Sequence, residues 1–126
     1  MKLNGEMIVA LFCLSLSVIP LLVIGIVQFR SRHPVGFWSG VKPPLAENVK
    51  DVRAYNQRHG IMWIVYSVGL AAAFFSGYMI DSSGVVWSIM VFVWAVGGIL
   101  VMMLYHNHLE KKYVRGTNCL KREAEK

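Results

Sequence analysis

Residues 61–105 of this chain read IMWIVYSVGLAAAFFSGYMI, then DSSG, then VVWSIMVFVWAVGGILVMMLY, and they decide the fold. The two apolar runs, 61–80 and 85–105, contain 20 and 21 residues and no Asp, Glu, Lys, Arg or His. As helices they would each be about 30 Å long, which is the thickness of the hydrocarbon core of a bilayer. Because only the four residues 81–84 connect them, we expect two antiparallel transmembrane helices joined by a tight polar turn.

A third apolar run, 7–29, reads MIVALFCLSLSVIPLLVIGIVQF and has no ionisable side chain except Cys13. Its 23 residues are enough to span a bilayer. The basic flank follows this run and no small-x-small cleavage motif stands out, so we expect a retained transmembrane helix and not a cleaved signal peptide. Pro20 within the run cannot donate a hydrogen bond to the carbonyl of Leu16, which predicts a bend there.

The composition excludes a water-soluble globule. The chain has 126 residues, of which 56% are hydrophobic and only 16% are charged. So few polar residues cannot cover a core of matching size in water, and a chain this short is not a multidomain enzyme. We therefore expect a single all-α membrane domain over residues 1–126, with the lipid bilayer as its main surroundings.

The basic residues are clustered along the chain, and their positions predict its orientation. The formal net charge is +6, and twelve of the thirteen Lys and Arg residues fall in the connection 30–60 and the tail 106–126. Basic flanks stay on the cytoplasmic side of membrane spans. We expect a multi-pass protein of the plasma membrane with its N-terminus outside and its C-terminus in the cytoplasm. No nucleic-acid-binding motif accompanies the charge, so we expect no nucleic-acid partner.

Small residues indicate how the spans pack. Gly69, Ala73 and Gly77 recur at a spacing of four in the run 61–80, and Gly97 and Gly98 lie in the run 85–105. Small residues let helix backbones approach closely in lipid, where no hydrophobic force draws helices together. They predict the seam of the helical hairpin, although the same stripe would also suit a homodimer.

The connection 30–60 is longer and more apolar than a simple linker. After Pro43 and Pro44, an apolar stripe recurs at spacings of four, three and three. Its members are Leu45, Val49, Val52 and Tyr55. This pattern predicts an amphipathic interfacial helix of about a dozen residues, packed on the spans or lying on the lipid, before Gly60 turns the chain into the second span. The expected fold is thus three transmembrane helices plus one interfacial helix.

Two short patterns in this connection resemble a known family. Residues 36–40 read GFWSG, and Tyr55-Asn56 is followed by Gly60 and Trp63 at the opening of a span. This arrangement is similar to the glycine-aromatic segment and the later aromatic/polar pair of SdpI-type small bacterial membrane proteins. The resemblance implies a polytopic protein, akin to immunity factors against a secreted peptide toxin or to relays that hold a repressor at the membrane. It draws attention to Trp38, Tyr55 and Asn56 as binding residues.

Two histidines at the cytoplasmic boundary are further candidates for binding. His59 precedes the second span and His106 follows the third. In an antiparallel helix pair their rings can approach each other, and imidazoles either bind metals or titrate near neutral pH. His108 lies only two residues beyond His106, on the other side of a helix. We therefore expect interfacial polar residues and no metal site.

Motifs for catalysis are missing from the sequence. It has no nucleophile with a matching base, no isolated pair of carboxylates and no glycine-rich phosphate loop, so we expect neither an enzyme nor a cofactor. We expect an interaction, immunity or signalling module that acts through its cytoplasmic loop, with a protein partner or a second copy. Two alternatives stay open. One is an oligomeric pore or transporter subunit lined by Ser15, Ser17, Gln28 and Ser67, and the other is an accessory subunit of a larger membrane complex.

Overall fold

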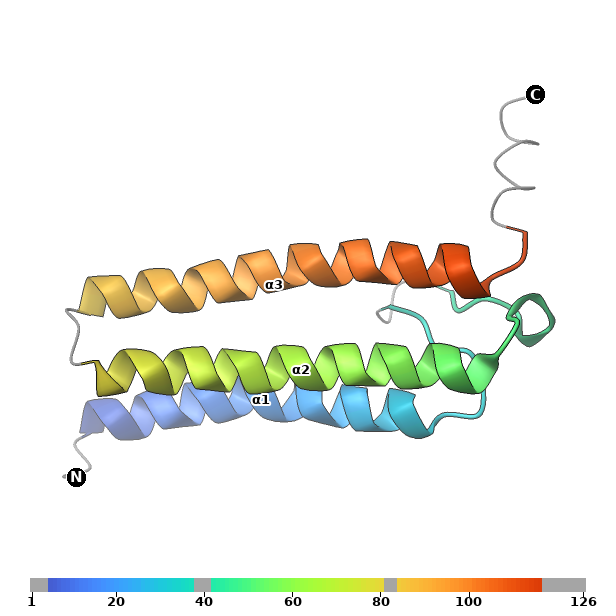
Figure 1. Cartoon of the computed structure of the whole chain (residues 1–126). Coiled ribbons are helices and arrows are strands. Elements are labelled where there is room, and N and C mark those ends of the chain that lie inside the picture. The colour runs from blue at the N-terminus through green and yellow to red at the C-terminus, as the bar shows by residue number, and fades with distance from the viewer. Residues whose placement is uncertain (1–4, 38–41, 81–83, 117–126) are drawn as a thin grey trace.

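The computed structural model describes residues 5–37, 42–80 and 84–116 and contains three long helices (Figure 1). In chain order the elements are α1 (Gly5–Arg30), the short 3-10 helix η1 (Ala46–Asn48), α2 (Val52–Met79) and α3 (Gly84–Tyr113). Each of the three long helices is long and apolar enough to cross a membrane. The chain thus has the all-α architecture of a multi-pass membrane protein, as its three apolar runs predict.

The helices extend beyond two of these runs. α2 begins at Val52, nine residues before the run 61–80, and α3 ends at Tyr113, eight residues after the run 85–105. The start of α2 is defined by Asp51, whose backbone is extended and whose carboxylate accepts a hydrogen bond of 3.0 Å from the amide of Ala54. Such a cap satisfies one of the free amides of the first helical turn.

The predicted interfacial helix is not present as a separate element. Of its apolar stripe, Leu45 and Val49 flank η1, whereas Val52 and Tyr55 already belong to α2. Gly60, expected to turn the chain, lies inside α2 and does not interrupt it. The periodicity of the stripe reflects burial against other segments: Val49 and Tyr55 are both buried, and Val49 pairs with Val114 in an isolated antiparallel bridge.

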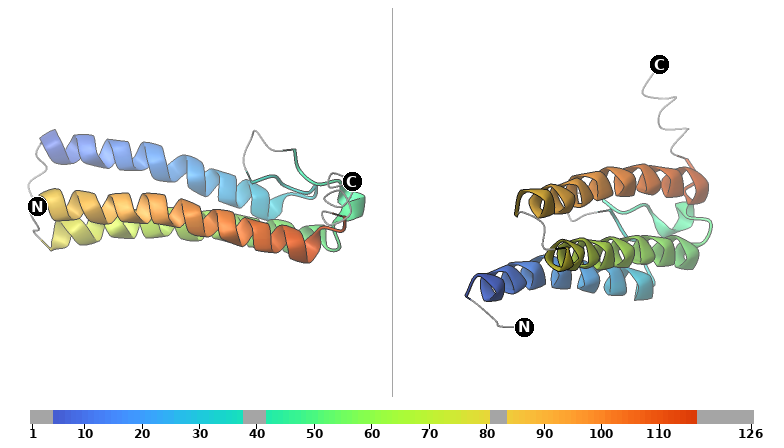
Figure 2. Two further views of the ribbon diagram at one scale, coloured as in Figure 1. Left: turned by 90° about the horizontal axis from the view of Figure 1, so that it is seen from above. Right: turned by 60° about the vertical axis from the view of Figure 1, so that its left-hand side comes forward.

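Gly60 is instead required where α1 and α2 cross. A Cβ atom at Gly60 would lie 2.6 Å from the carbonyl oxygen of Gly25 and 2.7 Å from the Cβ atom of Phe29. A Cβ atom at Gly25 would in turn lie 3.0 Å from the carbonyl oxygen of Gly60. Only glycine allows this backbone contact between helices. Figure 2 shows α2 between α1 and α3, so α2 is the central helix of the bundle.

Aromatic side chains fill the small-residue positions between α2 and α3. Trp94 of α3 lies against Gly69 of α2, and Tyr66 of α2 lies against Gly98 of α3. The tyrosine hydroxyl donates a hydrogen bond of 3.0 Å to the carbonyl of Ala95. The prediction that small residues form the hairpin seam is therefore confirmed for Gly69, Gly98 and also Gly77, which Trp87 contacts. These glycines accept aromatic rings and do not bring the two backbones together.

Candidate functional site

The basic residues that the structure describes gather at one end of the bundle. α1 ends, α2 begins and α3 ends at this end (Figure 1). The basic residues of the described chain, all at or near this end, are Arg30, Arg32, Lys42, Lys50, Arg53, Arg58, Lys111, Lys112 and Arg115. That this basic end faces the cytoplasm stays a prediction.

A pair of histidines joins α2 to α3 at the basic end. Nε2 of His59 and Nδ1 of His106 are 2.9 Å apart, and Nδ1 of His59 is 3.0 Å from the backbone carbonyl oxygen of Tyr55. A carbonyl oxygen only accepts, so Nδ1 of His59 carries a hydrogen and donates it. In a neutral His59 ring, Nε2 then accepts the hydrogen bond from Nδ1 of His106. The pair thus has a defined tautomer.

The histidine pair is enclosed by aromatic rings. The ring of Tyr55 lies 4.3 Å from that of His59, and Phe37 stacks on His106 with centroids 4.9 Å apart. On its remaining side, Nε2 of His106 is 3.5 Å from a carboxylate oxygen of Glu110, one helical turn further along α3. This distance is too long for a strong hydrogen bond, although a protonated His106 would be attracted to the carboxylate.

Burial favours the neutral form of both rings, which lie just outside the apolar runs 61–80 and 85–105. Burial lowers the pKa of His59 to about 4. The hydrogen bond to Tyr55 opposes this shift, and the neighbouring His106 adds to it. Burial also lowers the pKa of His106, and the carboxylate of Glu110 opposes this shift. At neutral pH the pair is an uncharged link between two helices.

Asn56 attaches the chain that follows α1 to the start of α2. Its amide nitrogen donates hydrogen bonds to the carbonyl oxygens of Ser31 (3.0 Å) and His33 (2.8 Å). Its side-chain oxygen accepts a hydrogen bond of 3.1 Å from the amide of Val35. One buried side chain thus satisfies three backbone groups of an irregular segment, which suits a structural role.

The structure brings four of the five predicted binding residues together in the interior. Tyr55, Asn56 and His59 are 0% exposed, and the side chain of His106 is 12% exposed. Trp38 lies outside the described residues. A partner at the surface of the basic end would therefore meet other side chains first. Glu110 is not among the predicted binding residues, although its spacing of four from His106 on one helix is a recognisable signal in the sequence.

The surface of the basic end is built from two chain segments that we call the basic cap, residues 42–51 and 111–116. The amide of Lys50 donates to the carbonyl of Tyr113 (2.8 Å), and the amide of Arg115 donates to the carbonyl of Asn48 (2.6 Å). Beneath these bonds, Val49 packs in a cluster with Tyr55 and Leu109. The connection between the first two spans is thereby fixed to the end of the third.

The four polar residues considered for a pore do not share a face. Ser15 and Ser17 are exposed on α1, and their hydroxyls donate to carbonyls of their own helix. Ser67 is buried and donates to the carbonyl of Trp63, and Gln28 donates to the carbonyl of Gly36. Within the described residues, no group of three or more His, Cys, Asp or Glu side chains is placed to hold a metal ion.

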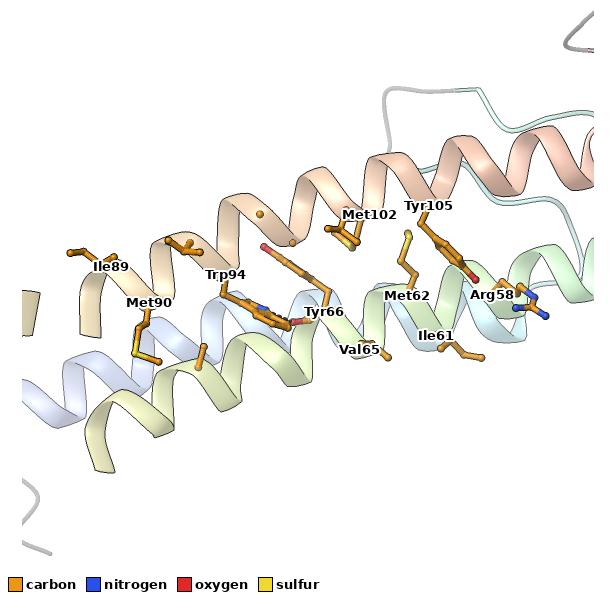
Figure 3. A pocket seen from close by; sticks show the side chains of 15 residues that line it. Arg58, Ile61, Met62, Val65, Tyr66, Ile89, Met90, Trp94, Met102 and Tyr105 are labelled. Atoms are coloured by element: carbon orange, nitrogen blue, oxygen red, sulfur yellow. Dashed lines mark hydrogen bonds between the residues drawn. The ribbon is translucent and has the colours of Figure 1, made fainter. Parts of the chain in front are cut away.

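A groove of about 810 Å³ runs between α2 and α3 (Figure 3). Most of its lining is aliphatic or aromatic, including Val65, Trp94 and Met102. Arg58 and Tyr105 lie at the end of the groove nearest the basic cap.

No family model, no curated protein and no solved structure matches this chain. Its function is therefore inferred from the geometry of the basic end and the groove, and the resemblance to SdpI-type proteins stays a prediction.

Proposed function

We propose that this chain is a plasma-membrane interaction module that binds a protein partner through the basic cap, with the cap in the cytoplasm. The observation that supports this most directly is the pair of backbone hydrogen bonds, Lys50–Tyr113 and Arg115–Asn48, that joins the loop before α2 to the end of α3 and the residues just after it. A surface loop fixed in this way loses little conformational entropy when a partner binds.

The cap presents the chemistry of a protein-binding surface. Leu45 is 63% exposed, and Lys50 and Arg115, which belong to the same cap, are also exposed. An exposed aliphatic side chain with basic neighbours suits a partner that has an apolar contact surrounded by acidic residues. The proposal assigns no catalytic residue. It agrees with the resemblance to SdpI-type immunity and relay proteins, and a partner within a larger complex would make the chain an accessory subunit.

The test is affinity purification of the tagged chain from native membranes. We expect a protein partner to co-purify with the wild-type chain and to fall at least tenfold with the double variant Leu45→Glu, Lys50→Glu, because both changes oppose the proposed contact. The control is Arg32→Glu, which reverses an exposed charge outside the cap. All variants should elute at the same volume in detergent.

Two outcomes would contradict the proposal. One is a partner that is retained equally by the double variant and the control. The other is a chain that purifies without a partner and gives a selective conductance in proteoliposomes, which would favour the pore.

A further inference from the structure

The groove between α2 and α3 is a surface feature that the proposed function does not use. On α2 its lining runs from Arg58 to Ala73, a rise of about 22 Å along the helix. One leaflet of the hydrocarbon core is about 15 Å deep. The groove therefore starts at the boundary between headgroups and hydrocarbon and continues through the full depth of one leaflet.

The boundary end of the groove carries a positive charge. The guanidinium of Arg58 interacts with the hydroxyls of Tyr105 and Tyr113, and Arg58 is exposed. Within the described part of the chain, no carboxylate forms an ion pair with this guanidinium. An arginine whose guanidinium donates only to neutral hydroxyls keeps further N–H groups for an anion such as a phosphate.

The volume of the groove distinguishes between the possible occupants. A helix that ran the same 22 Å with a diameter of about 10 Å would occupy about 1,700 Å³, roughly twice the 810 Å³ available. Large apolar side chains such as Ile61 and Val93 make up most of the lining, and only Ala73, Gly97 and Gly98 are small. A flexible hydrocarbon chain fits both the volume and the lining.

From these observations we infer that the α2–α3 groove binds an anionic phospholipid, with an acyl chain along the groove and the headgroup phosphate at Arg58. This site does not include Leu45 or Lys50, the two cap residues changed in the test of the proposed function. A zwitterionic lipid has the same acyl chains but carries a positive group beside its phosphate, so the anionic headgroup is preferred at Arg58.

The test measures lipid retention by native mass spectrometry of the full chain. The probes are phosphatidylglycerol and phosphatidylcholine with identical acyl chains, added in equal amounts to protein in neutral detergent. We expect one phosphatidylglycerol to be retained per chain in preference to phosphatidylcholine. Arg58→Gln should reduce this retention about tenfold, because one charge-assisted contact is lost. Arg53→Gln, a neighbouring exposed arginine on α2 that does not line the groove, should leave it unchanged.

A second variant tests the groove itself. Gly97 lines the groove, and a Cβ atom added there meets nothing within 4 Å, so Gly97→Leu should fill the groove without disturbing the fold. We expect it to abolish retention of phosphatidylglycerol. Ala72→Leu, at an exposed position on α2 outside the groove, is the matched control. Thermal unfolding of each variant shows whether the bundle is intact.

Three results would overturn the inference. The first is equal retention of the two lipids by the wild-type chain. The second is retention that Arg58→Gln and Gly97→Leu both leave unchanged, which indicates lipid held elsewhere on the surface. The third is a protein dimer that Gly97→Leu dissociates, because the occupant of the groove would then be a second copy of the chain.

Discussion

His59 and His106 are 47 positions apart in the sequence, yet their ring nitrogens are 2.9 Å apart. Each ring is placed by its own helix: Tyr55, one turn before His59, accepts its hydrogen bond, and Glu110 lies one turn after His106. A hydrogen bond between two imidazoles needs one ring to accept, so this link is lost when both are protonated. The pair therefore makes the attachment of α3 to α2 sensitive to acid.

We predict that the folded protein loses stability as the pH falls from about 6.5 towards 4. The pKa of His59 is about 4 in the fold, below the ordinary 6.5, so the unfolded chain binds the proton more readily. The contribution of the neutral ring is complete above pH 6.5, and protonation would remove up to about 3 kcal/mol by pH 4. Thermal unfolding in detergent at several pH values measures this slope.

His59→Phe should flatten this acid slope while lowering stability at neutral pH, because it removes the titrating group and its hydrogen bonds. His108→Ala, at an exposed histidine on α3, is the control and should keep the slope. A slope that His59→Phe leaves unchanged would assign the acid sensitivity to other groups.

At the scale of elements, the start of α2 shows how a tertiary contact overrides a local pattern. The stripe from Leu45 to Tyr55 has helical spacing, but Asp51 caps a helix that begins only at Val52. Asn48 and Lys50, just before Asp51, are held instead by backbone hydrogen bonds to Arg115 and Tyr113 at the end of α3. Gly60 is expected to turn the chain, but it lies within α2. α1 packs so closely against it that a side chain at this position would clash.

Gly60→Ala should therefore destabilise the bundle by about 1–3 kcal/mol, the usual cost of adding a methyl group to a packed contact. The added Cβ atom would lie 2.6 Å from the carbonyl oxygen of Gly25, so α1 and α2 must separate. Gly97→Ala is the matched control, because a Cβ atom there meets nothing within 4 Å. Denaturant unfolding compares the two variants, and equal stability would show that the helices cross without this contact.

At the scale of the whole molecule, the three helices place residues from distant parts of the chain at one end. Residues 48–50 pair with residues 113–115 there, and Asn56 attaches the chain after α1 to α2. The opposite end carries no Lys or Arg among the described residues. This asymmetry supports a single orientation in the membrane.

We predict that Arg53→Cys and Lys112→Cys are labelled by a membrane-impermeant thiol reagent only after the cytoplasmic side is exposed, in a background of Cys13→Ser and Cys119→Ser. Ile80→Cys, at the opposite end of α2, should be labelled from the outside. Labelling of Arg53→Cys and Lys112→Cys from opposite sides would contradict the fold as well as the orientation.

The sequence by itself determined the number and the approximate extent of the spans. The hydropathy of 7–29, 61–80 and 85–105 is a local property, because an apolar run of this length is stable in lipid whatever its neighbours are. Only the tertiary structure decided which residues at the basic end of the bundle are buried. The sequence predicts Tyr55, Asn56 and His59 as binding residues, but contacts with segments that are distant in the chain bury all three. A local pattern carries no information about such contacts.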